Sequence, residues 1–178
     1  MARPFKTLVG RRLAVDNLTD DLLGKDYSPL VRAPLNRVSV VTATSVTLTR
    51  EDYDGKHINL NRAGGIIVNL PAATTANVGT NFDFYIPTSL SGTTKIKAAN
   101  ASDTIMGRVF VDASLASNAD VSFSAGSTAD TISLNGTTTG GKKGDHFCLK
   151  VVASNQWAAY GEIQATGVSA TPFVVSVS

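Results

Sequence analysis

Residues of the kinds that form catalytic, metal and disulfide sites are scarce in this sequence. It has one cysteine, Cys148, so no disulfide can form within the chain, and only two histidines, His57 and His146. Cys148 lies in the apolar run 147–149, which favours a buried and inert thiol. Charged residues make up only 17% of the chain, and no run approaches the roughly 20 apolar residues of a membrane span. We therefore expect no membrane partner.

The N-terminal segment and the net charge bear on where the protein is made and on whether it binds nucleic acid. The N-terminus carries charges and lacks the continuous apolar stretch of a signal peptide, so we expect synthesis in a cytoplasm. The formal net charge of +2 is too small to indicate nucleic-acid binding by the body of the protein, which would need a strongly basic domain. We expect no nucleic-acid partner.

The few titratable residues do not form a recognisable catalytic motif. His57 stands close to Glu51, Asp52 and Asp54, which permits a metal site or acid–base chemistry, but no second histidine lies at ligand spacing. A solvated turn is the better interpretation, with 52–55 as a hairpin turn. Asp145 and His146 are adjacent without a nucleophile motif. We expect no catalytic residue, no metal, no cofactor and no small-molecule substrate, and hence no enzyme.

Two further segments have both a functional and a structural interpretation. The glycine-rich stretch 140–144 could cradle a phosphate, but it lacks the Gly-Lys-Ser/Thr ending of a P-loop, so we favour a mobile surface loop. Trp157, with Tyr160 three residues later, could form a sugar-stacking platform. A core or inter-subunit aromatic pair is the interpretation we favour, because Trp157 lies in a predicted strand with small neighbours.

The first 37 residues differ in character from the rest. Positive charges fill the segment 1–12, acids follow over 16–26, and prolines at 4, 29 and 34 forbid one long helix. One short helix is expected after Thr19, and it needs a surface to pack on. Apolar residues alternate with the charges, which suits an extended arm docked on a partner protein. The predicted docking residues are Arg3, Phe5, Lys6, Arg11, Arg12, Leu13, Leu22, Leu23 and Tyr27.

The remaining chain, 38–178, has the pattern of a β domain. Short runs alternate between apolar and polar residues, as in 58–61, and are separated by turn residues such as those at 63–65 and Asn135-Gly136. Neither heptads nor a strict internal repeat occurs. We predict an all-β body, an antiparallel β-sandwich or barrel-like fold of jelly-roll or β-tulip type, preceded by the extended N-terminal arm.

Several turn and strand patterns of this body resemble a known β module. They are the segments 67–74, 79–84, 95–100 and 102–107 in the first half, and 130–141, 143–145 and 156–161 in the second. The body is similar to the module found in capsid decoration (cement) proteins of tailed phages and in their head and tail fibre proteins. The resemblance covers about 38–178. It implies a homotrimer, a place on the virion and no enzymatic activity.

The resemblance and the predicted N-terminal arm lead us to expect one of two functions. The first is a virion structural protein, a cement protein whose partners are the major capsid protein and its own copies, and which stabilises the outer surface of the head. A trimer on a local threefold axis would match the symmetry of such a site. The alternative is a short head or tail fibre, or receptor-binding protein, that recognises a host-surface glycan through loops such as 137–143.

Overall fold

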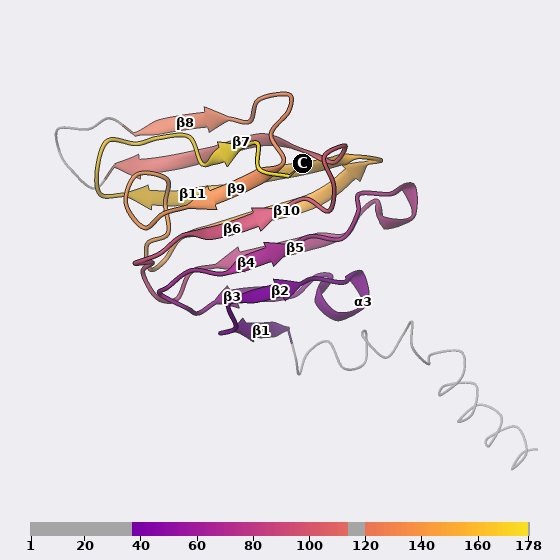
Figure 1. Ribbon diagram of the computed structural model, residues 1–178, viewed down its shortest axis with the longest axis horizontal. Coiled ribbons are helices and arrows are strands. Elements are labelled where there is room, and N and C mark those ends of the chain that lie inside the picture. Colours follow the sequence, from indigo (N-terminus) through magenta and orange to yellow (C-terminus); the bar gives the residue numbers. More distant parts are fainter. Residues whose placement is uncertain (1–36, 114–119, 178) are drawn as a thin grey trace, which may run out of the picture. The chain divides into compact units, whose positions relative to one another are not determined.

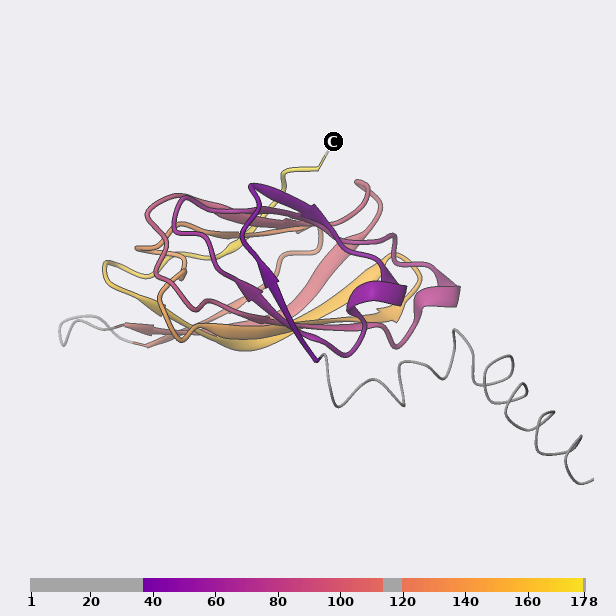
Figure 2. The same ribbon diagram turned by 90° about the horizontal axis from the view of Figure 1, so that it is seen from below.

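The computed structural model describes residues 37–113 and 120–177. The chain divides between Arg37 and Val38 into two units, and the described residues other than Arg37 belong to the second. It is a β-sandwich of two sheets packed face to face, which Figure 2 shows from the side. The predicted all-β sandwich is confirmed. The predicted arm residues lie outside the described residues.

The seven-stranded sheet has the order β1-β3-β5-β10-β11-β7-β8 (Figure 1). These strands span Val38–Val41, His57–Leu60, Asn81–Tyr85, His146–Ala153, Gln156–Ala165, Thr104–Ala113 and Val121–Ser124, respectively. The five-stranded sheet has the order β12-β9-β6-β4-β2. Its strands span Phe173–Val174, Thr131–Leu134, Thr94–Lys97, Ile67–Asn69 and Ser45–Thr47.

Both sheets are mixed rather than purely antiparallel. The chain alternates between the sheets from β1 to β6, so that β1, β3 and β5 are parallel neighbours in one sheet and β2, β4 and β6 in the other. After each strand the chain crosses to the opposite sheet, forms a strand there and crosses back. Its next strand in the first sheet runs in the same direction as the previous one, so these two strands pair in parallel. β7 and β11 are also parallel, over ten residue pairs. The antiparallel pairs involve β8, β9, β10 and β12.

The core lies between the two sheets because every second residue of a strand points inward. In β3, Ile58 and Leu60 are fully buried, while His57 and Asn59 point outward. Aromatic rings fill the centre. The rings of Phe82 and Trp157 stack with centroids 5.6 Å apart, and those of Phe84 and Phe147 with centroids 5.2 Å apart.

The segment 52–55, predicted as a hairpin turn, begins in a one-turn helix and ends in a turn at 54–55. The helix, α3 (Arg50–Tyr53), is capped by the Thr49 side chain, which accepts the Asp52 N–H. It joins β2 to β3, which lie in different sheets, so no hairpin can form there. Asn135-Gly136 forms a turn, as predicted: Oδ1 of Asn135 accepts the N–H groups of Thr137 and Thr138. This turn does not join a hairpin, since β9 and β10 belong to different sheets.

Candidate functional site

The outward side of the seven-stranded sheet brings together polar residues that are far apart in the sequence. His57 of β3, Asp83 of β5 and His146 of β10 lie on three neighbouring strands. Nδ1 of His57 lies 2.7 Å from Oδ2 of Asp83, and Nε2 of His146 lies 2.5 Å from Oδ1. The carboxylate therefore bridges two imidazoles whose ring centroids are 6.3 Å apart. Tyr85 stands beside His57 at 5.5 Å between ring centroids.

The hydrogen-bonding capacity of a carboxylate determines which ring nitrogens of this bridge carry protons. An ionised carboxylate only accepts hydrogen bonds, so each ring nitrogen that faces Asp83 carries the proton and donates it. In the neutral tautomers, Nε2 of His57 and Nδ1 of His146 are then acceptors. Each histidine uses a different oxygen of the carboxylate, which stands between them. Within the described residues, no group of three histidine, cysteine or acidic side chains is arranged to hold a metal ion.

Sequence reasoning missed this bridge. It treated His57 with the acids at 51–54, which precede it in the sequence, and found no second histidine near it. The structure pairs His57 instead with a carboxylate 26 residues away and, through it, with His146. No local spacing rule gives this, because the cluster depends on the register of three strands.

Cys148 lies next to the bridge on the same side of the sheet. Its thiol is almost completely buried and donates a hydrogen bond to Oδ1 of Asn81. Burial is the largest effect on this thiol and raises its pKa. A cysteine becomes a nucleophile only as the thiolate, so Cys148 has the properties of an unreactive thiol. The predicted burial of Cys148 is confirmed.

Trp157 and Tyr160 of β11 point to opposite sides of the sheet. Trp157 is fully buried in the core, which excludes a sugar-stacking role for it. Tyr160 points outward and is 56% exposed. The hydrogen bond with the Cys148 thiol is the main reason that the pKa of Tyr160 is raised. Of the predicted aromatic pair, only Tyr160 is available to another molecule.

The glycine-rich stretch 140–144 is a loop, as predicted, but only Lys143 and Gly144 of it are exposed at the surface. Gly140 and Gly141 are buried, and the Asp145 carboxylate accepts the N–H groups of Gly141 (2.6 Å) and Lys142 (3.0 Å). Its other oxygen accepts the N–H of Gln164 at 2.9 Å. The backbone donors that would cradle a phosphate are thus already occupied by a carboxylate of the same chain.

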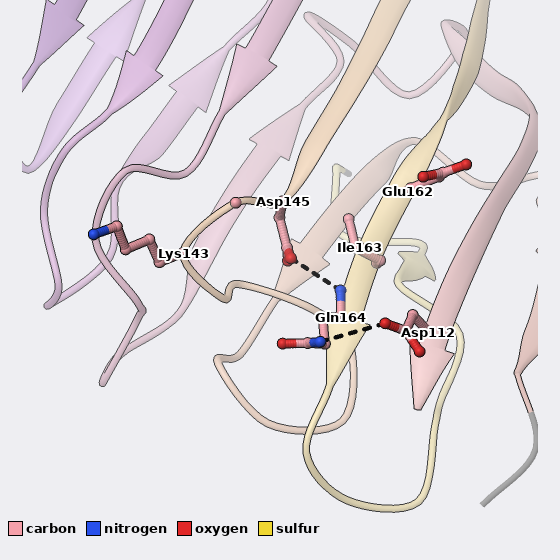
Figure 3. Close-up of a pocket in the computed structure, with 7 residues that line it drawn as sticks. Asp112, Lys143, Asp145, Glu162, Ile163 and Gln164 are labelled. Carbon is pink, nitrogen blue, oxygen red and sulfur yellow. Dashed lines mark hydrogen bonds between the residues drawn. The ribbon is translucent and has the colours of Figure 1, made fainter. Parts of the chain in front are cut away.

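A shallow hollow of about 250 Å³ opens beside this loop (Figure 3). Its walls come from the ends of β7 and β11 and from the segment 143–145. Figure 3 shows the Lys143 side chain directed away from Asp145, while Gln164 donates to Asp112 at 3.3 Å. The volume is below the roughly 300–1,000 Å³ of typical ligand pockets. Because its buried carboxylate bonds only backbone, we assign this hollow a structural role.

Two more buried carboxylates hold backbone rather than face a cavity. Asp103 accepts the N–H of Ala73 at 3.0 Å, which ties β7 to the loop that follows β4. Asp130 accepts the N–H groups of Ser176 and Val177 and so fastens the end of the described chain. Both aspartates follow turns, at 101–102 and 127–128, but they are buried and join distant segments of backbone.

No family model, curated protein or solved structure matches this chain. None of the helices in the described ranges has the length and apolar character needed to cross a membrane.

Proposed function

We propose that this chain is a structural virion protein without enzymatic activity: a capsid decoration, or cement, protein that binds the outer surface of a tailed-phage head as a trimer. The major capsid protein and further copies of the chain are its partners. The proposal combines the resemblance of 38–178 to the decoration module with the chemistry of the folded body.

The observation that carries the proposal is how the body uses its buried acids. Asp103, Asp130 and Asp145 all accept hydrogen bonds from backbone N–H groups of distant segments. The Oδ1 atom of Asp103 has no hydrogen-bond partner, but it is buried and faces no solvent. A catalytic carboxylate needs a free oxygen directed at a substrate. Carboxylates that fasten loops to strands suit a rigid protein that must persist outside a cell.

Cement function places simple physical demands on such a protein. A head under pressure from packaged DNA is strengthened when each added copy spans a joint between capsid subunits. Three arms on one trimer would act together, because once one arm is docked the others bind at a high effective concentration. The cationic and apolar sequence of 1–37 fits this docking role.

A short fibre or receptor-binding protein is the second candidate. Tyr160 favours it, because an exposed aromatic ring beside polar side chains is a common surface for stacking a sugar. The arm would then attach the protein to the tail or to a single vertex.

Cryo-electron microscopy of purified particles tests the proposal directly. We expect density for the sandwich at threefold positions over the whole head, with hundreds of copies per particle. Density confined to the tail or to one vertex would refute the cement role and support the fibre. A particle that carries no density for the sandwich at all would refute both.

A further inference from the structure

The outward side of the seven-stranded sheet, called the open face below, is unlike the rest of the described surface. No described element covers it (Figure 2). Six of the ten exposed large hydrophobic residues in the described ranges lie on it. They are Val38, Val40, Met106, Phe110, Val152 and Tyr160.

The outward side of the other sheet provides the contrast. Its central strands present Lys95 and Lys97 of β6 and Asn69 of β4, and its edge strand β2 presents Ser45 and Thr47. Ile67 of β4 is the one residue of these strands among the exposed large hydrophobics. Apolar residues gathered mainly on one of two comparable faces mark that face as an interaction surface.

Strand register shows which side chains lie in line across the open face. One transverse row consists, from β1 to β8, of Val38, His57, Asp83, Cys148, Tyr160, Arg108 and Ser124. The adjacent row consists of Val40, Asn59, Tyr85, His146, Glu162, Phe110 and Ser122.

These rows are self-complementary about the line between β10 and β11. Asp83 and Arg108 lie at equal distances on either side of that line, in the same row. His146 and Glu162 flank the line and are already cross-strand neighbours within one chain, so the complementarity rests on Asp83 and Arg108. Within one chain, Asp83 and Arg108 are three strands apart, about 14 Å, which is too far for an ion pair. Within the described ranges, the Arg108 side chain forms no hydrogen bond or ion pair, although its backbone pairs with β11 and β8.

We propose that the open face binds the open face of a second copy of this chain, around a twofold axis parallel to the strands between β10 and β11. This axis sets Asp83 against Arg108 of the second copy, and His146 against its Glu162. Tyr85 then meets Phe110 across the axis. An axis between β5 and β10 would set Arg108 against an apolar Val38 instead.

The dimensions of the face fit this occupant. The six strands that have a counterpart across the axis, all but β1, contain 41 residues. At about 3.3 Å per residue and 4.8 Å between strands, they cover on the order of 650 Å² per copy. A stable protein–protein interface takes about 800 Å² from each partner. Sheets stacked face to face are rotated by about 30°, but Asp83 and Arg108 lie within about 7 Å of the axis, where this rotation displaces them little.

The inference does not rest on the proposed virion role, and it is compatible with a trimer. A twofold contact on this face leaves the sheet edges and the other sheet free for a threefold contact. The expected assembly of the full chain is therefore two copies, or six if trimers form as well.

Charge exchange tests the pairing on the full-length chain, with mass measured by sedimentation at several concentrations. Arg108→Asp places two acids opposite each other, and Asp83→Arg places two arginines opposite each other. We expect either change alone to weaken association at least tenfold and to halve the mass. The double variant exchanges the two signs and should restore the wild-type mass. Lys97→Asp on the opposite sheet is the matched control and should leave the mass unchanged.

Asp83 also holds two histidines, so a second variant is independent of it. Tyr160→Glu puts a charge beside the axis without touching the bridge, and it should also halve the mass. A wild-type mass of one or three copies would overturn the inference, as would a double variant no better than its parents. The latter result would indicate a different occupant, such as the chain's own residues 1–36 or a host glycan. Particle imaging is unaffected by these outcomes, so the two proposals fail separately.

Discussion

Asp145 illustrates at the scale of one residue how the body is fastened together. Its carboxylate accepts three backbone N–H groups, two from the glycine-rich segment and one from β11. An unsatisfied buried donor costs about 1–3 kcal/mol. Asp145→Ala leaves three donors without their partner, partly open to water from the adjacent hollow. We expect the free energy of unfolding to fall by about 3 kcal/mol, measured from urea denaturation.

Asp112 supplies the matched control for that prediction. It borders the same hollow, but its one described side-chain partner is Gln164, at 3.3 Å. Asp112→Ala should therefore change the free energy of unfolding by no more than about 0.5 kcal/mol. Equal losses in the two variants would show that the three N–H bonds of Asp145 are not the source of its effect.

The same residue predicts a pH dependence. Burial raises the pKa of Asp145, and the backbone N–H bonds and Lys142 oppose that rise only in part. The folded protein then binds this proton more tightly than the unfolded chain, whose aspartates titrate near 3.9. The stabilisation by the protonated carboxyl is complete below that value and is lost as the pH rises through the folded pKa.

We therefore expect the carboxyl carbon of Asp145 to titrate above the range of the exposed aspartates in an NMR pH series. The stability difference between the wild-type protein and Asp145→Ala should also shrink as the pH rises across the same interval. Titration of Asp145 below pH 3.9 would contradict this expectation, because it would mean that the N–H bonds outweigh burial.

At the scale of elements, the long parallel pair β7–β11 depends on one glycine. Gly107 has φ +112°, and a Cβ at that position would lie 2.1 Å from the carbonyl oxygen of Ala159 on β11. Gly107→Ala combines an unfavourable backbone conformation with a backbone clash, so we expect a loss of about 3 kcal/mol in the free energy of unfolding. Gly126→Ala is the control, since a Cβ there meets nothing within 4 Å. Similar melting temperatures for both variants would contradict the assigned role of Gly107.

The strands themselves could be predicted from the sequence, whereas their partners could not. The alternation at Ile58 and Leu60 and the turn residues place each strand to within a few residues, because burial of one face imposes a period of two. Parallel pairing depends on the chain crossing from one sheet to the other between β1 and β6. No local pattern of residues in the sequence predicts that crossing. The His57–Asp83–His146 bridge was missed for the same reason, since its members meet only through strand register.

At the scale of the whole molecule, the body has a core of its own. The described core cluster begins at Val41 and draws only on residues of the sandwich. Deletion of 1–37 should therefore leave the free energy of unfolding within about 0.5 kcal/mol of the full chain. The proposed docking role predicts that the same deletion abolishes binding to particles that lack the protein. Full binding by the truncated protein, measured by co-sedimentation, would refute docking through the arm.

Charge reversal within the arm separates its electrostatic contribution from its apolar one. Arg11 and Arg12 form the densest positive charge in 1–37, and an acidic capsid surface would attract them. Arg11→Glu with Arg12→Glu should weaken particle binding most at low salt, because at 0.1 M ionic strength screening acts over about 10 Å and becomes stronger as salt is added. Replacement of Leu22 and Leu23 by serine should weaken binding equally at all salt concentrations. If the arginine variant shows no dependence on salt, the arm binds through its apolar residues alone, and the charges at 11 and 12 have another purpose.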